Sequence, residues 1–428
     1  MADDVFDAVI VGGGVAGGTA AYVLAKAGCD VLVVERGNFA GSKNMTGGRL
    51  YAHSLESIIP DFAKDAPVER RVVREKISML TADSGVTLDY QNAGPVKAAE
   101  TSWTVLRASF DQWLMSKAED AGAQVITGVK VDELIVRDGK VCGIKAGEDE
   151  IEAHAVILAD GVNSLLAKKL GVTQHITPHS VAVGVKELLE FSPLQMEERF
   201  GCKGDEGMAW LFAGAPSGGH MGGGFLYTNK TTVSLGMVMG LHNVDKFERS
   251  VPQMLEDFKN HPLVAPLVQG GKLLEYSAHM VPEGGLNMVS GLVGDGYLIA
   301  GDAAGLCLNV GYTVRGMDLA IASGEAAAKA IIMAKEKNNF SKTTLNYYRQ
   351  LLDSSFVMND MQIYKGMPEM MDNPRLFTQY PEMAADTMKS LFTVNGPQIK
   401  LRKKITPHIK KIGLLNLLKD GIKGVRSL

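Results

Sequence analysis

The chain has 428 residues, of which 46% are hydrophobic and 21% are charged, and its formal net charge at pH 7 is −4. This length predicts about three domain-sized units, and no apolar run approaches the ~20 residues that span a bilayer. The four cysteines lie far apart and form no C-x-x-C, which argues against a disulfide framework, a zinc site or an iron–sulfur cluster within the chain. The N-terminus shows no cleavable signal, so we expect a cytoplasmic protein, and we expect no nucleic-acid partner.

The first pattern in the chain is a glycine-rich turn between two β-rich runs. The apolar run Ala8–Val11 leads into GGGVAG at residues 12–17, a helix-compatible stretch follows to Lys26, and the run Asp30–Val34 ends on Glu35. This is the G-x-G-x-x-G fingerprint of dinucleotide binding, with a strand before it, a helix after it and an acid at the expected distance. The sequence therefore predicts a Rossmann-type βαβ unit.

Each residue of the fingerprint has a predicted role. Gly12 makes the tight turn, Gly14 lets the backbone approach a pyrophosphate, and Gly17 lets the helix pack closely on the strand. The N-terminus of the helix offers free N–H groups and the positive end of its dipole to the phosphates. Glu35 is expected to accept a hydrogen bond from a ribose hydroxyl.

The segments that follow contain several turn signals. Residues 105–123, VLRASFDQWLMSKAEDAGA, favour an amphipathic helix. We expect turns at Asp83–Gly85 and Asn229-Lys230, and a hairpin at Asp138-Gly139, because Asp-Gly is a strong signal for a two-residue hairpin loop.

Two later strands are expected to end at the same ligand. The apolar strand Ala155–Ala159 closes on Asp160-Gly161, and residues 297–305, YLIAGDAAG, form a strand that ends in Gly-Asp before a long alanine-rich helix. This resembles flavoproteins of the glutathione-reductase and hydroxylase type, in which the Asp of that second motif binds the ribityl chain of FAD. Asp302 fits the position, and an ordinary helix N-cap is the alternative role for it. With the fingerprint, these motifs predict that the dinucleotide is FAD.

The predicted fold class is α/β: a Rossmann-type FAD-binding domain with an inserted β-rich domain and a helical C-terminal region. The segments expected to make up each unit are 1–75, 104–175 and 281–335 for the FAD-binding domain, 76–103 and 176–280 for the β-rich substrate- or quinone-type domain, and 336–428 for the mainly helical region.

The C-terminal tail differs in charge from the rest of the chain. Residues 397–428 contain nine Lys or Arg and one acid, a net charge of +8, so the preceding residues carry −12. The apolar residues of the tail recur at helical spacing between the lysines, at Ile409, Ile412, Leu415, Leu418 and Ile422. A basic amphipathic segment indicates peripheral contact with a membrane surface or docking of a partner, and a terminal helix packed on its own domain is the alternative.

Four further stretches are informative: 34–51 (VERGNFAGSKNMTGGRLY), 105–114 (VLRASFDQWL), 276–288 (YSAHMVPEGGLNM) and 298–328 (LIAGDAAGLCLNVGYTVRGMDLAIASGEAAA). Within them, Lys43-Asn44, Gly47-Gly48-Arg49 and Glu283-Gly284-Gly285 are the more particular signals. With these residues the chain resembles, essentially end to end, the FixC family of flavoproteins, relatives of electron-transfer-flavoprotein:quinone oxidoreductase.

The resemblance implies a flavoprotein that accepts electrons from an electron transfer flavoprotein pair, FixA and FixB, and passes them to a quinone or another high-potential acceptor. The four-cysteine cluster domain of the quinone oxidoreductase is absent, since no cysteine follows Cys307. FixC-type proteins likewise lack it and are associated with a small ferredoxin-like subunit, FixX. In some members the electron transfer is part of flavin-based electron bifurcation.

The flavin itself carries the redox chemistry, so no catalytic side chain is expected. Gly47-Gly48 is expected to let a loop lie against the flavin ring, and the stretch Gly305–Gly316 to supply backbone N–H groups near it. Arg107 is expected either to reach the pyrophosphate or to form a surface salt bridge. Lys43 and Asn44 either touch the flavin or form a turn.

Cys307 and His279 are expected to be structural residues. No metal ligand is expected. The complete set of expected cofactor-binding residues is Gly12, Gly14, Gly17, Glu35, Arg36, Asn44, Gly47, Gly48, Arg107, Val131, Asp160, Gly161, Asp302, Gly305 and Gly311.

Three other functions fit the same motifs. The first is an FAD-dependent monooxygenase, which requires NAD(P)H and a closed pocket for an aromatic substrate. The second is a geranylgeranyl-reductase-like enzyme, and the third is a non-enzymatic FAD-carrying subunit of a larger complex. The basic tail, the absent cluster domain and the Glu283-Gly284-Gly285 segment favour electron transfer over all three.

Overall fold

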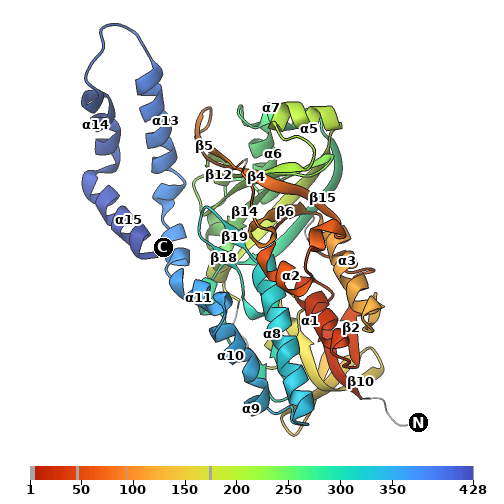
Figure 1. Ribbon diagram of the computed structural model, residues 1–428. Coiled ribbons are helices and arrows are strands. Elements are labelled where there is room, and N and C mark those ends of the chain that lie inside the picture. Colours follow the sequence, from red (N-terminus) through yellow and green to blue (C-terminus); the bar gives the residue numbers. More distant parts are fainter. Residues whose placement is uncertain (1–4, 45–47, 93, 173–175, 428) are drawn as a thin grey trace.

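The computed structural model describes residues 5–44, 48–92, 94–172 and 176–427, and two large sheets organise the fold (Figure 1). The first sheet has the strand order β16-β17-β10-β1-β2-β7, and β9 with β8 pairs with the start of β10. Its central strands are parallel, so their carboxyl ends meet at one edge of the sheet. The strands are β1 (Phe6–Val11), β2 (Val31–Glu35), β7 (Gln124–Thr127), β8 (Glu133–Arg137), β9 (Lys140–Ala146), β10 (Asp149–Leu158), β16 (Val293–Gly294) and β17 (Tyr297–Ile299).

Three helices pack together beside this sheet: α1 (Val15–Lys26), α3 (Arg107–Asp120) and α8 (Met317–Glu336). The predicted close packing of the alanine-rich helix is confirmed. A Cβ on Gly324 of α8 would lie 2.3 Å from the carbonyl oxygen of Ala16 on α1, a distance that no side chain tolerates. The small residues on both helices thus bring α8 against the glycine turn, and all of β2 and the last four residues of β1 are buried.

The second sheet has the order β15-β11-β14-β13-β12-β4-β6-β3, with β5 beside β4. Two helices that begin with Ser/Gln capping boxes, α5 (Pro193–Phe200) and α6 (Val251–Asn260), bury apolar residues in a separate core with it. The strands are β3 (Gly48–Tyr51), β4 (Val68–Leu80), β5 (Gly85–Gln91), β6 (Ser102–Val105), β11 (Val181–Glu190), β12 (Glu206–Gly214), β13 (Gly222–Thr228), β14 (Thr232–Gly240) and β15 (Lys272–Pro282).

The three predicted turns are confirmed. Asp138 and Gly139 join β8 to β9 with φ of 49° and 78°, the left-handed backbone that a two-residue hairpin loop requires. Asn229-Lys230 lies between the paired strands β13 and β14, and the Asp83 turn lies between β4 and β5. The residues of these turns therefore help to set how the strands on either side pair.

The C-terminal region is helical, as predicted. In Figure 1, α13 and α14 run side by side as an arm beyond the two sheets, and α15 returns toward α12. The carboxylate of Asp420 on α15 accepts hydrogen bonds from Arg375 at 2.6 Å and from Tyr380 at 2.5 Å, which anchors the returning helix. The helices are α9 (Lys342–Leu345), α10 (Tyr347–Asp353), α11 (Phe356–Ile363), α12 (Met367–Met371), α13 (Gln379–Phe392), α14 (Leu401–Ile412) and α15 (Leu414–Ser427).

The apolar stripe expected along the tail is not continuous. Gly413, at φ 90°, ends α14 before α15 begins, because this backbone conformation favours glycine and breaks the helix. Ile412 is buried, whereas Leu415, Leu418 and Ile422 are exposed on α15. The exposed apolar face therefore belongs to α15 and includes Val425.

The remaining connections contain short elements: α2 (His53–Ile58), α4 (Leu165–Lys169), α7 (Ala265–Val268), and the two-residue strands β18 (Leu308–Asn309) and β19 (Val314–Arg315). Across the described part of the chain, no helix combines the length and the hydropathy that crossing a bilayer requires.

Candidate functional site

One cavity of about 460 Å³ lies where the carboxyl edge of the first sheet meets the second sheet. The first sheet contributes the ends of β1, β2 and β10 and the loop after β17. The second sheet contributes residues of β12, β13 and β15, and Met371 and Phe377 of the C-terminal region complete the wall. The site is therefore built from all three parts of the chain.

The three fingerprint glycines are required for different reasons. A Cβ on Gly12 would lie 2.3 Å from the carbonyl oxygen of Ala159, and one on Gly17 would lie 2.0 Å from the carbonyl oxygen of Gly12. Those two glycines serve the packing of β1, α1 and β10. A Cβ on Gly14 would meet only side-chain nitrogens of Arg107 and Asn44, at 3.7 and 3.8 Å, and would occupy the cavity at the N-terminus of α1. The protein therefore leaves the space at Gly14 open for a ligand.

Glu35 is nearly buried at the end of β2 and lines the same cavity. Its carboxylate accepts hydrogen bonds from the backbone N–H groups of Gly13 at 2.7 Å and Gly37 at 2.6 Å. These bonds fix the glycine turn relative to β2. A carboxylate has about four acceptor positions, so Glu35 retains capacity for a ribose hydroxyl.

Arg107 forms an ion pair inside the cavity wall. Its Nε and Nη2 donate to the carboxylate of Asp111 at 2.7 and 2.8 Å, and Nδ2 of Asn44 donates to the same carboxylate at 2.5 Å. Asp111 is fully buried and Arg107 is 19% exposed, so this is not the surface salt bridge considered as an alternative. The pair places a fixed cation and the Asn44 amide beside the open space at Gly14.

Asp302 lies in a short 3-10 helix, Gly301–Ala304, directly after β17. The N-cap alternative is wrong, because Ala300 occupies the cap position. No described residue donates a hydrogen bond to the Asp302 carboxylate, and burial raises its pKa while Arg107 and His279 oppose that rise. A half-buried acceptor without a protein donor at a cavity wall suits a ligand that brings hydroxyl donors.

Most of the expected binding residues line this cavity, and the exceptions are Gly17, Gly305 and Gly47. Gly17 packs against the Gly12 carbonyl, and Gly305 lies against Met288, where a Cβ would come within 2.6 Å, so neither lines the cavity. Gly47 lies outside the described residues. Those that line it are Gly12, Gly14, Glu35, Arg36, Asn44, Gly48, Arg107, Val131, Asp160, Gly161, Asp302 and Gly311.

Glu283 has a half-buried carboxyl in the cavity wall, and the sequence indicated it only as part of a glycine-rich segment. Its closest polar contact is Nδ2 of Asn309, which donates to Oε2 at 3.3 Å. Burial raises the pKa of Glu283 to about 7, against the opposing hydrogen bond from Asn309. A side pocket of about 10 Å³, room for one water molecule, also borders Glu283. The sequence signal that could have identified Glu283 is its position directly after the strand β15.

Cys307 lies beside this carboxyl and lines both spaces. Burial raises the pKa of its thiol well above the ordinary value, and Glu283 and Asp302 add to that rise. The residue is therefore a neutral thiol, which agrees with a structural role rather than that of a reactive thiolate.

Lys186 on β11 is a second charged residue that the sequence did not reveal. It is completely buried, and its Nζ has no hydrogen-bond partner among the described residues. Ser277, opposite it on β15, has an equally unpartnered hydroxyl. Burial lowers the pKa of Lys186 to about 7, with Glu275 opposing and Arg107 adding to the shift.

Comparison with known protein families assigns three regions of the chain. Residues 7–170 match the family of FAD dependent oxidoreductases, and residues 181–281 match the ubiquinone-binding region of ETF-QO. Residues 367–428 match the C-terminal domain of the ETF-QO/FixC family.

Individual relatives match over the whole length. The chain is 59% identical to Protein FixC of Salmonella typhimurium and 60% identical to the probable electron transfer flavoprotein-quinone oxidoreductase YdiS of Escherichia coli K12, with complete coverage of each chain. Among solved structures, a geranylgeranyl bacteriochlorophyll reductase-like protein from Thermoplasma acidophilum superposes with a TM-score of 0.73 at 20% identity, covering 98% of this chain and 99% of that one. The halogenase PltM with bound FAD gives a TM-score of 0.63 at 14% identity, over 98% and 86% of the two chains.

These comparisons confirm the predicted fold class and the predicted cofactor, FAD. The residues that line the cavity independently fit FAD. It offers an open glycine at a helix N-terminus, a fixed cation beside it, and the half-buried Asp302 carboxylate, to which no described residue donates, in the same wall.

Proposed function

The chain belongs to the ETF-QO/FixC family of FAD-dependent oxidoreductases, and from this premise we propose that it passes electrons from an electron transfer flavoprotein pair to a quinone. The observation that supports this most is the composition of the cavity. Its walls combine the fingerprint residues with the strands β12, β13 and β15 of the region that matches a ubiquinone-binding family. A quinone headgroup entering from that side would share one space with FAD.

The chain's own residues would hold the cofactor by its polar groups. The N–H groups at the start of α1 and the Arg107 guanidinium would hold the pyrophosphate, and Asp302 would accept from hydroxyls of the ribityl chain. Bound FAD supplies the electron chemistry, because it accepts two electrons and gives them up again. The backbone of Gly222–Gly224 lines the opposite wall, and packing within the protein requires these glycines, since a Cβ on Gly223 would lie 2.3 Å from the carbonyl oxygen of Phe212.

Glu283 would supply a proton on the acceptor side. Reduction of a quinone to a quinol takes up two electrons and two protons, and the reduced cofactor would give up both electrons and one of the protons. Glu283 would supply the other proton, since the O–H bond of its carboxyl breaks as an O–H bond forms on a quinone oxygen. A proton from solvent, passed through a water in the side pocket, would then return to Glu283. The Asn309 amide holds the carboxyl toward the cavity throughout.

We propose a FixA/FixB-like pair as electron donor and a small FixX-like ferredoxin subunit as partner, because the described residues bring no set of cysteines together that could hold a cluster. Electron bifurcation within such a complex is the wider role that the family suggests.

The donor side can be tested with nicotinamides. In the isolated FAD-loaded protein under anaerobic conditions, NADH and NADPH are expected to leave the flavin absorbance unchanged over seconds, whereas a reduced electron transfer flavoprotein pair bleaches it. Stopped-flow absorbance at the flavin band measures both. Rapid bleaching by NADPH that an aromatic compound accelerates would instead support the monooxygenase alternative.

The tail, residues 397–428, is proposed to mediate association with an anionic membrane surface or with the small partner subunit. The exposed residues Leu415, Leu418 and Ile422 lie on α15 among basic side chains. Replacing these three with serine is expected to weaken binding to anionic vesicles or to the partner while FAD content stays unchanged. High salt is expected to weaken it as well, since each basic residue near an anionic surface contributes about 1 kcal/mol.

The matched control is Leu194→Ser, which changes an equally exposed leucine on α5. Vesicle co-sedimentation and partner pull-down are the two measurements. Binding that is insensitive both to salt and to the three substitutions would contradict the proposal, as would equal loss in Leu194→Ser.

A further inference from the structure

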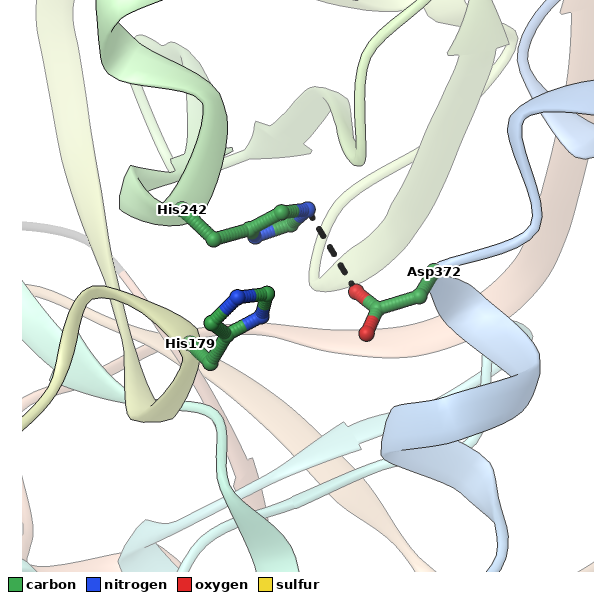
Figure 2. A group of neighbouring side chains, drawn as sticks. All are labelled: His179, His242 and Asp372. Carbon is green, nitrogen blue, oxygen red and sulfur yellow. Dashed lines mark ion pairs between the residues drawn. The ribbon is translucent and has the colours of Figure 1, made fainter.

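Three side chains from distant parts of the sequence converge at the junction of the middle and C-terminal regions (Figure 2). His179 comes from the 3-10 helix Pro178–Ser180, His242 from the 3-10 helix Leu241–Lys246, and Asp372 directly follows α12. One ligating atom from each lies within 4.8 Å of the others. The two imidazole rings are stacked, with centroids 4.8 Å apart, and Figure 2 shows the Asp372 carboxylate facing the nitrogen-bearing edge of both rings.

We propose that His179, His242 and Asp372 bind one divalent transition-metal ion of the zinc class. Two imidazoles and one carboxylate are the ligands such an ion takes, with water in the remaining position of an open site. His179 and Asp372 are exposed, so solvent can reach that fourth position.

The spacing of His242 and Asp372 favours a shared metal over a direct hydrogen bond. Nε2 of His242 lies 3.4 Å from Oδ1 of Asp372. A charge-assisted hydrogen bond between such groups is typically about 2.7–2.9 Å long. Two ligands at about 2.0–2.2 Å from a tetrahedral zinc ion are separated by roughly 3.4 Å, which matches the observed distance. The His179 ring would then need only to turn toward the ion.

The site would fix a segment that closes the cavity. Met371, next to Asp372, lines the cavity, and so does Phe377, whereas His242 belongs to the region that matches the ubiquinone-binding family. A metal bridging the two regions would hold residues 371–377 in place over the acceptor side. No single stretch of sequence could reveal this site, because each ligand comes from a different segment.

The test uses untagged, FAD-loaded, full-length protein that has been treated with EDTA and dialysed. We expect it to bind one Zn²⁺ per chain by calorimetry and one Co²⁺ with the absorption of a coordinated ion, and EDTA to reverse both. His242→Gln and Asp372→Asn are expected to weaken binding more than tenfold, since even residues that only orient a metal ligand contribute 10–100-fold. His154→Gln, which alters a histidine stacked on Phe340 instead, is expected to bind normally.

A second measurement distinguishes an ion that holds residues 371–377 in place from an ion bound only to the surface. Zn²⁺ is expected to slow amide hydrogen exchange in residues 367–378 of the unaltered protein and to have no effect in Asp372→Asn. Flavin content and the thermal transition report that each variant is folded. Absent binding, binding that His242→Gln leaves unchanged, or equal loss in His154→Gln would overturn the proposal.

Discussion

A Gly14→Val variant is expected to fold normally and to lose FAD. The reason is geometric, since a side chain at Gly14 contacts no backbone atom and instead fills the space between α1 and Arg107 where the pyrophosphate would lie. We expect affinity to fall more than tenfold, a loss above about 1.4 kcal/mol, with Gly14→Ala intermediate. Flavin absorbance of the purified protein, titration with free FAD and circular dichroism together measure this.

The matched comparison is Gly17→Ala, three residues along the same helix. Here a Cβ would collide with the Gly12 carbonyl oxygen at 2.0 Å, so the variant is expected to lose stability as well as cofactor. Gly14→Val protein that purifies with full FAD content would show that the pyrophosphate does not lie at this turn.

The second large effect is expected at Glu283. Replacing it with glutamine keeps the side chain nearly the same size but removes the transferable proton, so quinone reduction is expected to fall by about 100-fold or more, as for other general acids. FAD binding and flavin reduction by the donor are expected to remain. Exposed Glu256 on α6 provides the control, and Glu256→Gln is expected to have no effect.

The pH dependence follows from the raised pKa of about 7. Below that pH the Glu283 carboxyl is protonated and can donate, so turnover is expected to fall as pH rises through about 7, and Glu283→Gln is expected to lack this fall. The raised pKa of Glu283 also affects stability. Between pH 4.5, the ordinary pKa of a glutamate, and about pH 7, the unfolded chain has already released the Glu283 proton while the folded protein still holds it, so the free energy of unfolding is expected to decrease as pH rises. If turnover of the wild-type protein does not fall as pH rises through about 7, or if Glu283→Gln turns over at the wild-type rate, Glu283 is not the proton donor.

Local sequence patterns predicted the first βαβ unit and the close-packed helix α8, because their causes lie within a few residues. The glycine turn requires a tight backbone, and alanine and glycine on α8 allow it to approach α1. The same reasoning predicted roles for Glu35, which ends β2, and for Asp302, which follows β17, and both residues line the cavity at the carboxyl edge of the first sheet.

The residues that the sequence did not reveal depend on contacts between distant segments. Glu283 is notable only because the fold places it in the cavity wall beside Asn309 and Cys307. Lys186 is notable only because the fold buries it completely without a hydrogen-bond partner among the described residues. Arg107 was recognised, but its pairing with Asp111 and the link to Asn44 require the folded loop. Gly305 was predicted to bind the cofactor, but its backbone explains why it is a glycine. Its φ is 74°, and a Cβ there would collide with Met288, so no ligand is needed to account for this residue.

The tail shows how a single backbone conformation changes a periodic pattern. Helical spacing from Ile409 to Ile422 predicted one apolar face, but Gly413 divides it and turns Ile412 inward. Spacing alone contains no information about that break. The exposed part that remains lies on α15, where Asp420 also anchors the helix to Arg375.

The central claim is that FAD in this cavity delivers electrons to a quinone. The most direct measurement is to photoreduce the FAD-loaded protein under anaerobic conditions with a sacrificial electron donor such as EDTA, and to mix it with a water-soluble short-chain quinone in a stopped-flow spectrometer. We predict that the oxidised flavin spectrum returns, that one quinol forms per FAD, and that the rate saturates with quinone concentration. Flavin that stays reduced with quinone, yet is reoxidised by oxygen while an added aromatic compound is hydroxylated, would contradict the account.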